Sequence, residues 1–168
     1  AYSYNLLNRL VNTTNPANSV TSYTYDNSGN RLTESLAGKA SLFEYDALNR
    51  LKKMTHTGGQ TERFGYDADS NATSKTDGAN QTITFSFDAL SRMTSKNLPD
   101  TTSVAYEYDQ WGNLTHLADS SGTTSYTYDF LNRQTREEKT LQGLAGKTFV
   151  VERSYYDDGQ LQNLTDGA

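Results

Sequence analysis

A short pattern, aromatic-x-aromatic-Asp, recurs along the chain at a nearly constant interval and constrains its fold more than any other feature. The second aromatic residue stands at positions 4, 25, 45, 66, 87, 108, 128 and 156. Successive copies are therefore 20 or 21 residues apart, except for the degenerate last copy, Tyr155-Tyr156-Asp157, which follows after 28 residues. A fixed period of about 20 residues predicts a repeat architecture built from one supersecondary unit.

Each copy reads as a β-hairpin. Aromatic residues at i and i+2 lie on one face of a strand, and the polar residue between them lies on the other face. The Asp that follows can cap backbone N–H groups of a turn, and a nearby Gly or Asn tolerates positive φ. A second short strand comes next, and then another turn signal such as Gly58-Gly59 or Pro99-Asp100. The sequence thus predicts an all-β fold, a long antiparallel meander of about 15 or 16 strands coiled into a spiral or open barrel-like strip.

We expect residues 1–168 to form a single array of about eight hairpin units, with an insertion near residues 137–146. Residues 137–142 within that insertion could form a turn or two of helix. The copies alternate between two types, because copies one, three, five and seven continue with Leu-x-Arg and copies two and six continue with Gly-Asn. The alternation indicates a larger unit of two hairpins with different surroundings.

Composition excludes several classes of protein. The chain has no cysteine, which excludes disulfide scaffolds, thiolate zinc sites and cysteine nucleophiles. Its net charge of −5 disfavours nucleic-acid binding, which needs a basic footprint. No apolar run approaches the roughly 20 residues of a membrane-spanning helix, so we expect no membrane insertion. The 12 Tyr and 6 Phe supply the apolar surface, and the start at Ala1 without Met is typical of an excerpt from a longer chain.

The aspartates that follow the aromatics are the first candidates for chemistry. Paired carboxylates can hydrolyse glycosides when they are about 5–9 Å apart, but catalysis needs one special pair and not a ladder of copies. Turn capping is the simpler interpretation, so we expect no catalytic residue, no metal site and no cofactor. The residues assigned to the structural repeat are Tyr25, Asp26, Tyr45, Asp46, Tyr66, Asp67, Phe87, Asp88, Tyr108, Asp109, Tyr128 and Asp129.

Other residues stand near these turns or outside the pattern. Arg9, Arg31, Arg50, Arg92 and Arg133 follow the Asp position closely and could pair with its carboxylate or remain solvated. His56 and His116 lie 60 residues apart and read as surface strand residues. Trp111 is an aromatic residue that stands in a turn, outside the pattern, which makes it a possible ligand contact.

These residues resemble the YD repeats of the RHS family, which includes RHS toxins, the teneurin shell, and the B and C components of insecticidal toxin complexes. The resemblance rests on two stretches in particular, Tyr25-Asp26-Asn27-Ser28-Gly29-Asn30-Arg31-Leu32 and Tyr45-Asp46-Ala47-Leu48-Asn49-Arg50-Leu51. It implies a segment of a hollow shell that encloses another polypeptide, on a secreted or cell-surface protein. The self-cleaving Asp-Pro core of that family is missing here, since the prolines are Pro16 and Pro99.

The sequence is compatible with three functions. The first is a non-enzymatic structural wall segment of an RHS-type secreted or surface shell that encloses or presents a toxin or other polypeptide. The second is a carbohydrate-binding cell-surface module that uses the aromatic stripe, and the third is a polysaccharide-cleaving enzyme. The expected partner is the enclosed polypeptide or the rest of the RHS shell, with carbohydrate as the partner under the second function. Open sheet edges also predict self-association of the isolated chain.

Overall fold

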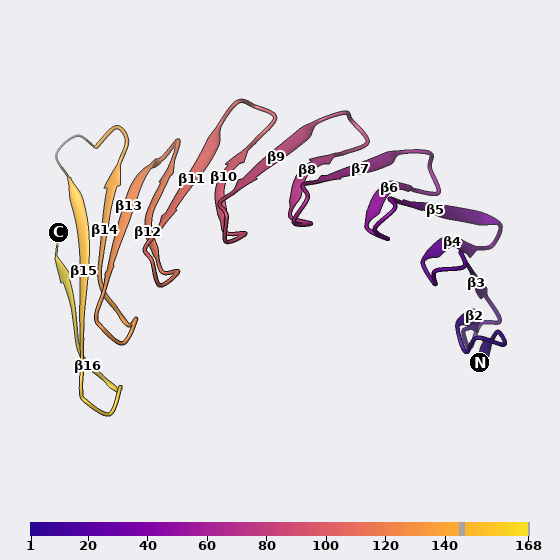
Figure 1. Ribbon diagram of the computed structural model, residues 1–168, viewed down its shortest axis with the longest axis horizontal. Helices are drawn as coiled ribbons and strands as arrows, with labels where there is room; N and C mark the ends of the chain where they lie inside the picture. Colours follow the sequence, from indigo (N-terminus) through magenta and orange to yellow (C-terminus); the bar gives the residue numbers. More distant parts are fainter. Residues whose placement is uncertain (145–146, 168) are drawn as a thin grey trace. The chain divides into compact units, whose positions relative to one another are not determined.

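The computed structural model describes residues 1–144 and 147–167, which form sixteen β-strands and contain no helix (Figure 1). The strands follow one another in the sheet in chain order, from β1 to β16, without a crossover. Paired neighbours run antiparallel. The predicted all-β antiparallel meander is therefore confirmed.

The chain divides into two compact units, Ala1–Ile83 and Thr84–Ala168. The strands of the first unit are β1 (Tyr2–Tyr4), β2 (Leu10–Thr14), β3 (Val20–Tyr25), β4 (Arg31–Leu36), β5 (Lys39–Tyr45), β6 (Leu51–Thr55), β7 (Thr61–Tyr66) and β8 (Ala72–Thr76). Strand β9 (Thr82–Phe87) begins in the first unit. The second unit continues with β10 (Met93–Asn97), β11 (Ser103–Tyr108), β12 (Leu114–Asp119), β13 (Gly122–Tyr128), β14 (Gln134–Leu141), β15 (Thr148–Tyr155) and β16 (Leu161–Gly167).

The turn after each aromatic strand has a recurring five-residue form. In the turn at residues 46–50, the Asp46 N–H donates to the Arg50 carbonyl at 2.9 Å, and the Asn49 N–H donates to the Asp46 carbonyl at 3.0 Å. Asn49 has a φ of 61°, in the left-handed region that Asn tolerates and Gly favours. The same requirement explains Gly29 and Gly112 at the equivalent positions of other copies, where φ is 92° and 93°.

A β-bulge accompanies this turn. Glu44 pairs with Lys53 and Tyr45 pairs with Leu51, so Lys52 is the additional residue on the second strand. The same register shift recurs in the other hairpins of this kind, immediately before the second aromatic residue in most of them. A bulge bends its strand and increases the local twist. No residue pattern in the sequence predicts the bulge, because the bulged residue has no fixed residue type.

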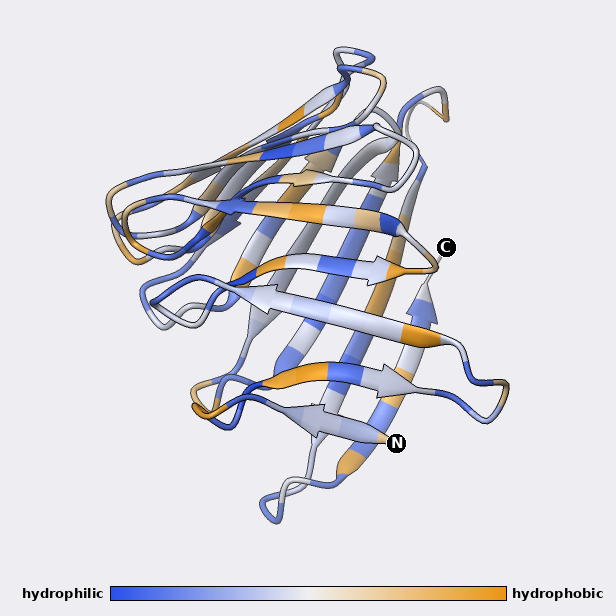
Figure 2. Ribbon diagram, turned by 90° about the vertical axis from the view of Figure 1, so that its right-hand side faces the viewer, coloured by the Kyte–Doolittle hydropathy of each residue, from blue (hydrophilic) through white to orange (hydrophobic). Residues whose placement is uncertain are grey.

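Each unit is a single layer. Among the described residues only Phe43 and Thr124 count as buried, at 7% and 6% exposure. The aromatic strands alternate as expected, with Val104, Tyr106 and Tyr108 partly buried and Ala105 and Glu107 exposed. Figure 2 shows hydrophobic and hydrophilic stretches alternating along the strands. Neighbouring side chains on the same face, and not a second layer, supply the packing.

Most of residues 137–142, for which the sequence allowed at most a turn or two of helix, belongs to β14. Strands β14 and β15 are both eight residues long, so the lengthened last interval is taken up largely by longer strands. Charged pairs favour this extension, because Arg136 binds Glu138 on its own strand and Glu152 on β15. Residues 145 and 146 of the expected insertion lie outside the described residues.

Candidate functional site

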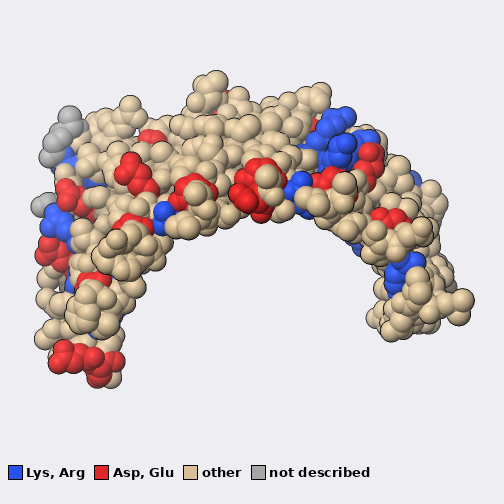
Figure 3. Space-filling view, viewed as in Figure 1, with Lys and Arg blue, Asp and Glu red and all other residues tan. Residues whose placement is uncertain are grey.

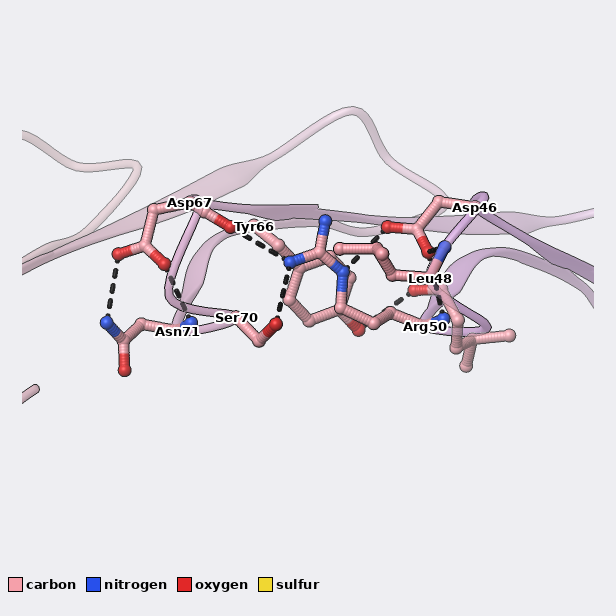
Figure 4. Close-up of polar contacts among 8 residues, drawn as sticks. Asp46, Leu48, Arg50, Tyr66, Asp67, Ser70 and Asn71 are labelled. Atoms are coloured by element: carbon pink, nitrogen blue, oxygen red, sulfur yellow. Dashed lines mark hydrogen bonds and ion pairs between the residues drawn. The ribbon is translucent and has the colours of Figure 1, made fainter.

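The carboxylate of each aspartate turn is used for capping. Asp46 Oδ1 accepts the N–H groups of Leu48 and Arg50, each at 2.9 Å, and Asp46 Oδ2 accepts Nε–H of Arg50 at 2.7 Å (Figure 4). These hydrogen bonds, first of all that from the Arg50 backbone, lower the pKa of Asp46 below its ordinary value. Asp88 accepts the same three hydrogen bonds from Leu90 and Arg92, and Asp129 accepts them from Leu131 and Arg133. We call the turns at residues 5–9, 46–50, 88–92 and 129–133 the Arg-type turns.

The alternate turns replace arginine by asparagine. Asp26 Oδ1 accepts the Asn30 N–H at 2.8 Å, and its Oδ2 accepts the Asn30 side-chain amide at 2.9 Å. The amide hydrogen bond is the main reason that the pKa of Asp26 is lowered. Asp67 and Asp109 are capped in the same way by Asn71 and Asn113. We call the turns at residues 26–30, 67–71 and 109–113 the Asn-type turns.

Each Arg-type turn is fastened to the next hairpin. Arg50 Nη1 donates to the Asp67 carbonyl at 2.9 Å and to Ser70 Oγ at 3.1 Å (Figure 4). The Arg50 guanidinium also lies 4.6 Å from the centroid of the Tyr66 ring. The Tyr66 hydroxyl donates back to the Leu51 carbonyl at 2.9 Å. We call this set of contacts the arginine clasp.

The clasp recurs inside both units. Arg9, Arg92 and Arg133 lie 5.0, 4.8 and 4.6 Å from the ring centroids of Tyr25, Tyr108 and Tyr155. Their Nη1 atoms donate to the carbonyls of Asp26, Asp109 and Tyr156. The tyrosine hydroxyls donate to the carbonyls of Leu10, Met93 and Gln134. The repeat therefore joins consecutive hairpins by the same chemistry each time.

The contacts of the arginine clasp show which tyrosine of the last copy is equivalent to the second aromatic residue of the other copies. Tyr155, and not Tyr156, stacks beneath the arginine and donates its hydroxyl to the preceding strand. Tyr156 takes the place of the aspartate, because its N–H donates to the Gln160 carbonyl as Asp46 does to Arg50. The last interval is thus one residue shorter than the sequence pattern indicates. The sequence pattern places the second aromatic residue at Tyr156, because Asp157 follows it.

Asparagine links join an Asn-type turn to the following Arg-type turn once in each unit. Asn30 Nδ2 donates to Asn49 Oδ1 at 2.7 Å, and Asn113 Nδ2 donates to Asn132 Oδ1 at 2.9 Å. Each of these bonds runs from an Asn-type turn to the following Arg-type turn. An Arg-type turn contacts the next hairpin through its arginine, and the Asn-type turns at residues 26–30 and 109–113 contact it through their asparagines. The two turn types therefore make different contacts with the hairpin that follows.

This alternating array matches a known family model. The model described as RHS Repeat matches residues 4–40, 66–103 and 94–124, which together exceed half of the chain. The chain belongs to the RHS repeat family. The resemblance seen in the sequence is thereby confirmed.

Solved structures with the same fold are toxin complex proteins. The crystal structure of TcdB2-TccC3-TEV aligns with a TM-score of 0.74 and 18% identity over 98% of this chain and 11% of that one. The Tc holotoxin pore of Photorhabdus luminescens aligns with a TM-score of 0.69 and 19% identity over 89% of this chain and 9% of that one. The RHS repeat chain thus spans about a tenth of the length of these structures. None of the curated protein sequences compared with it matches.

The sequence-predicted site residues lie in this framework as follows. The aromatic members, with Phe87 in copy five, stand at the ends of their strands, and the aspartates begin the turns. Within residues 1–144 and 147–167, no group of three His, Asp or Glu side chains could hold a metal ion. His56 lies beside Glu62 at 3.1 Å, and His116 lies on β12. No helix in the described part of the chain is long and apolar enough to cross a membrane.

Charged side chains recur at intervals along the face drawn in Figure 3, with acidic groups beside lysines and arginines in several places. Four of the five arginine candidates, Arg9, Arg50, Arg92 and Arg133, take part in an arginine clasp. Arg50, Arg92 and Arg133 bind the aspartate of their own turn, whereas Arg31 binds Glu34 at 3.0 Å and lies over the Phe43 ring. Sequence reasoning missed the contact of each arginine with the following hairpin, although the regular Arg-to-Tyr spacing was a usable signal.

Proposed function

We propose that this RHS repeat chain is a structural, non-enzymatic wall segment of a shell that encloses or presents another polypeptide. The observation that supports this proposal is the arginine clasp, which joins consecutive hairpins within each unit by identical contacts. The turn carboxylates accept two or three hydrogen bonds each from their own turns, so they serve capping and not proton transfer.

The single-layer construction favours a wall. One face of each unit presents half-buried rings, and the opposite face presents exposed polar residues such as Thr24, Glu44 and Glu107. A sheet with no second layer gains stability from length and from its neighbours, as in other repeat arrays. The relatives in solved structures are Tc toxin proteins, and the secreted location and the enclosed toxin polypeptide are proposed for this chain by analogy with them.

Protease protection of the enclosed polypeptide tests this proposal in the longer protein that contains the segment. Replacing both Arg50 and Arg92 by Ala loosens two clasps, so we expect faster cleavage of the enclosed polypeptide at unchanged protease concentration. The matched control replaces the exposed residues Lys52 and Lys139 by Ala and leaves the clasps intact. Equal cleavage of the enclosed polypeptide in all three proteins, at the rate of that polypeptide alone, would overturn the proposal.

We also propose that the isolated chain self-associates through its terminal strands. β1 and β16 stand at the two ends of the strand order, and all seven residues of β16 are exposed. Strands at the end of a sheet present backbone groups that template pairing with another chain. Light scattering should therefore show dimers or larger species, and Leu164→Lys on β16 should reduce them more than Leu90→Lys in a turn. A monomer at high concentration contradicts this proposal.

A further inference from the structure

The strands β1 and β16 stand at the two ends of the strand order, so each pairs with a neighbour on one side. Both belong to the repeat, and the contacts made at internal steps therefore show what a second neighbour has to supply. β1 leads into the Arg-type turn at residues 5–9, and β16 follows the turn at residues 156–160, where the alternation of turn types places an Asn-type turn. The internal step to compare with them runs from an Asn-type turn to the following Arg-type turn, as from residues 26–30 to residues 46–50.

The turn after β1 holds an acceptor that is used at the internal steps. Asn49 Oδ1 accepts from Asn30, and Asn132 Oδ1 accepts from Asn113. Asn8 has the same turn position and the same left-handed backbone, with a φ of 56°, but its side chain makes no hydrogen bond to the described residues. A neighbour of β1 that continues the repeat therefore has to bring an amide donor to Asn8.

The second aromatic residue of β1 holds a matching donor. In two other copies with an Arg-type turn, the tyrosine hydroxyl donates to the first residue of the strand before it, as Tyr45 does to the Arg31 carbonyl and Tyr128 to the Leu114 carbonyl. Tyr4 occupies this position in copy one and is 57% exposed. Its hydroxyl has no hydrogen-bond partner in the part of the chain that the structure describes. The neighbour therefore also has to bring a carbonyl to Tyr4.

The other end of the chain carries both missing groups. Gln160 is the fifth residue of its turn, where Asn30 stands in an Asn-type turn, and its side chain carries an amide. Tyr156 occupies the aspartate position of that turn, so no carboxylate of the turn holds the exposed Gln160 side chain. Leu161 is the first residue of β16, and its carbonyl is the counterpart of the one that Tyr45 binds on β4.

The charges of the two ends are opposite. Residues 1–25 contain Arg9 and no Asp or Glu. Residues 148–167, which include β15 and β16, carry a net side-chain charge of −3, from one arginine, Arg153, against four acidic residues, Glu152, Asp157, Asp158 and Asp166. Figure 3 shows acidic side chains at the tip of the turn between β15 and β16. Two β16 ends therefore repel each other, whereas a β16 end attracts a β1 end.

We propose that β16 of one copy of this chain pairs antiparallel with β1 of a second copy, head to tail. This inference rests on the proposed self-association of the chain and names its geometry. Across the junction, Gln160 of one copy donates to Asn8 of the second copy, and Tyr4 of the second copy donates to the Leu161 carbonyl of the first. The alternation of Asn-type and Arg-type turns thus continues from one copy to the next.

The register of this junction follows from the internal steps. There the third residue of the strand after the turn pairs with the residue three before the second aromatic, as Thr33 does with Leu42. The same rule places Asn163 of one copy opposite Ala1 of the second copy. A contact between two different surfaces leaves a partner strand exposed at each end of the dimer, so association continues into open chains or closed rings.

Proline variants block one end at a time. Ala1 exchanges two backbone hydrogen bonds with Thr14, and because such pairs alternate along an antiparallel ladder, the N–H of Tyr2 points away from β2. Tyr2→Pro therefore blocks the β1 edge without removing a hydrogen bond of its own hairpin, and Gln162→Pro blocks the β16 edge at the residue opposite Tyr2. Each variant alone should be monomeric by light scattering at a concentration at which the parent chain associates. An equimolar mixture should form dimers and nothing larger, since it offers one intact β1 and one intact β16.

The outcomes separate this inference from the self-association on which it rests. A parent chain that stays monomeric at high concentration contradicts both. A dimer of either proline variant alone shows that like ends pair, which refutes the head-to-tail contact and leaves self-association standing. A mixture that stays monomeric while the parent associates also refutes the head-to-tail contact.

A side-chain variant tests the same junction without changing the backbone. Gln160→Ala removes the amide donor for Asn8 and should weaken association of the parent chain about fivefold, the effect of one hydrogen bond of ordinary strength. Gln81→Ala is the matched control, because Gln81 is exposed in an internal turn and should leave association unaltered. Equal association of the two variants contradicts the contact between Gln160 and Asn8.

Salt distinguishes unlike ends from like ends. Raising the ionic strength from about 0.05 M to about 0.5 M screens charges at the surface. Association of the parent chain should weaken, because opposite charges meet at the head-to-tail contact, whereas a contact between two acidic β16 ends would strengthen. Association that is equal or stronger at high salt contradicts the proposed pairing.

Discussion

Arg50 shows why the repeat uses arginine at this position. Its Nε–H binds the Asp46 carboxylate of its own turn, its Nη1 binds the Asp67 carbonyl of the next hairpin, and its plane lies over the Tyr66 ring. These contacts need several donors in a fixed planar arrangement. A lysine ammonium is a single flexible point charge and satisfies only one of these partners well.

Arg50→Lys should therefore destabilise the chain although the charge is conserved. We expect a loss of about 1–2 kcal/mol in the free energy of unfolding, measured by denaturant titration, since charge-assisted hydrogen bonds are lost. Arg63→Lys on β7 is the matched control, because the Arg63 side chain is exposed and makes no hydrogen bond to described residues. Equal effects of the two substitutions would show that the clasp contributes nothing to stability.

Copy one offers a substitution that should stabilise the chain. Asn5 occupies the aspartate position and caps the Leu7 and Arg9 N–H groups through Oδ1. It has no second carboxylate oxygen, and Arg9 Nε is buried without a hydrogen-bond partner. Asn5→Asp should supply that partner and raise the free energy of unfolding by about 1 kcal/mol.

The turn at residues 15–19 provides the control for this prediction. Asn15 caps the Ala17 and Ser19 N–H groups with the same geometry, but its turn contains no arginine. Asn15→Asp adds the same charge without adding a partner, so its effect should stay within a few tenths of a kcal/mol. A stabilisation of equal size in both variants would assign the effect to charge and not to Arg9.

At the scale of the element, each hairpin combines a capped turn, a bulge and a cross-hairpin hydroxyl bond. The bulge places the second aromatic residue opposite the first residue of the following strand, as Tyr45 lies opposite Leu51. The hydroxyl of the same ring position then reaches the strand that comes before it, as Tyr45 does to the Arg31 carbonyl at 3.1 Å. One residue thus fixes both the turn register within its hairpin and the contact with the preceding hairpin.

Removal of one such hydroxyl should have a modest and local effect. Tyr66→Phe leaves the ring beneath Arg50 but leaves the Leu51 carbonyl without its donor, and we expect a loss of about 1 kcal/mol. Phe87 at the equivalent position of copy five shows that the repeat accepts the ring alone. Tyr23→Phe is the control, since the Tyr23 hydroxyl makes no hydrogen bond within the described residues. A larger loss for Tyr23→Phe would refute the role of the Tyr66 hydroxyl.

At the scale of the whole molecule, stability is spread over many similar contacts and not concentrated in a core. The accessible surface is 11192 Å², whereas a typical compact protein of this mass exposes roughly 8,300 Å². In such arrays stability is approximately a sum of terms for each repeat and for each contact between neighbours. A condition that weakens every turn by a small amount should therefore lower the free energy of unfolding by the sum of these amounts.

Acid is such a condition. Hydrogen bonds from their own turns lower the pKa of Asp26, Asp46, Asp67 and Asp88 in the folded chain. A carboxyl group with a lowered folded-state pKa stabilises the fold above its unfolded-state pKa, and this stabilisation is lost as pH falls through the folded-state pKa. Denaturation midpoints should thus fall steadily from about pH 5 to about pH 2.

The same experiment on an amide variant tests the cause. Replacing Asp46, Asp88 and Asp129 together by Asn retains Oδ1 as the cap but removes three titrating groups, as Asn5 does in copy one. The midpoint of this variant should be lower at pH 7 and should depend less on pH. An unchanged pH dependence would show that other carboxyl groups control acid unfolding.

The strand pattern and the turn positions could be predicted from the sequence because both are local. Alternating aromatic and polar residues define which face of a strand packs, and an Asp followed by Gly or Asn defines a turn, whatever the rest of the chain does. The all-β meander, the repeat and the family follow from these features alone. Residues 137–142, for which the sequence allowed at most a turn or two of helix, lie largely in β14, where a charged pair joins β14 to β15.

What only the tertiary structure decided is how one hairpin meets the next. The arginine clasp joins residues about 17 positions apart, such as Arg50 and Asp67, and depends on the bulge that sets the relative position of the strands. The distance between the turns at residues 109–113 and 129–133 likewise depends on the hydrogen bond between Asn113 and Asn132. Local patterns determine conformation within a hairpin, whereas distances between hairpins arise from hydrogen bonds and ring contacts that form only once the strands have paired.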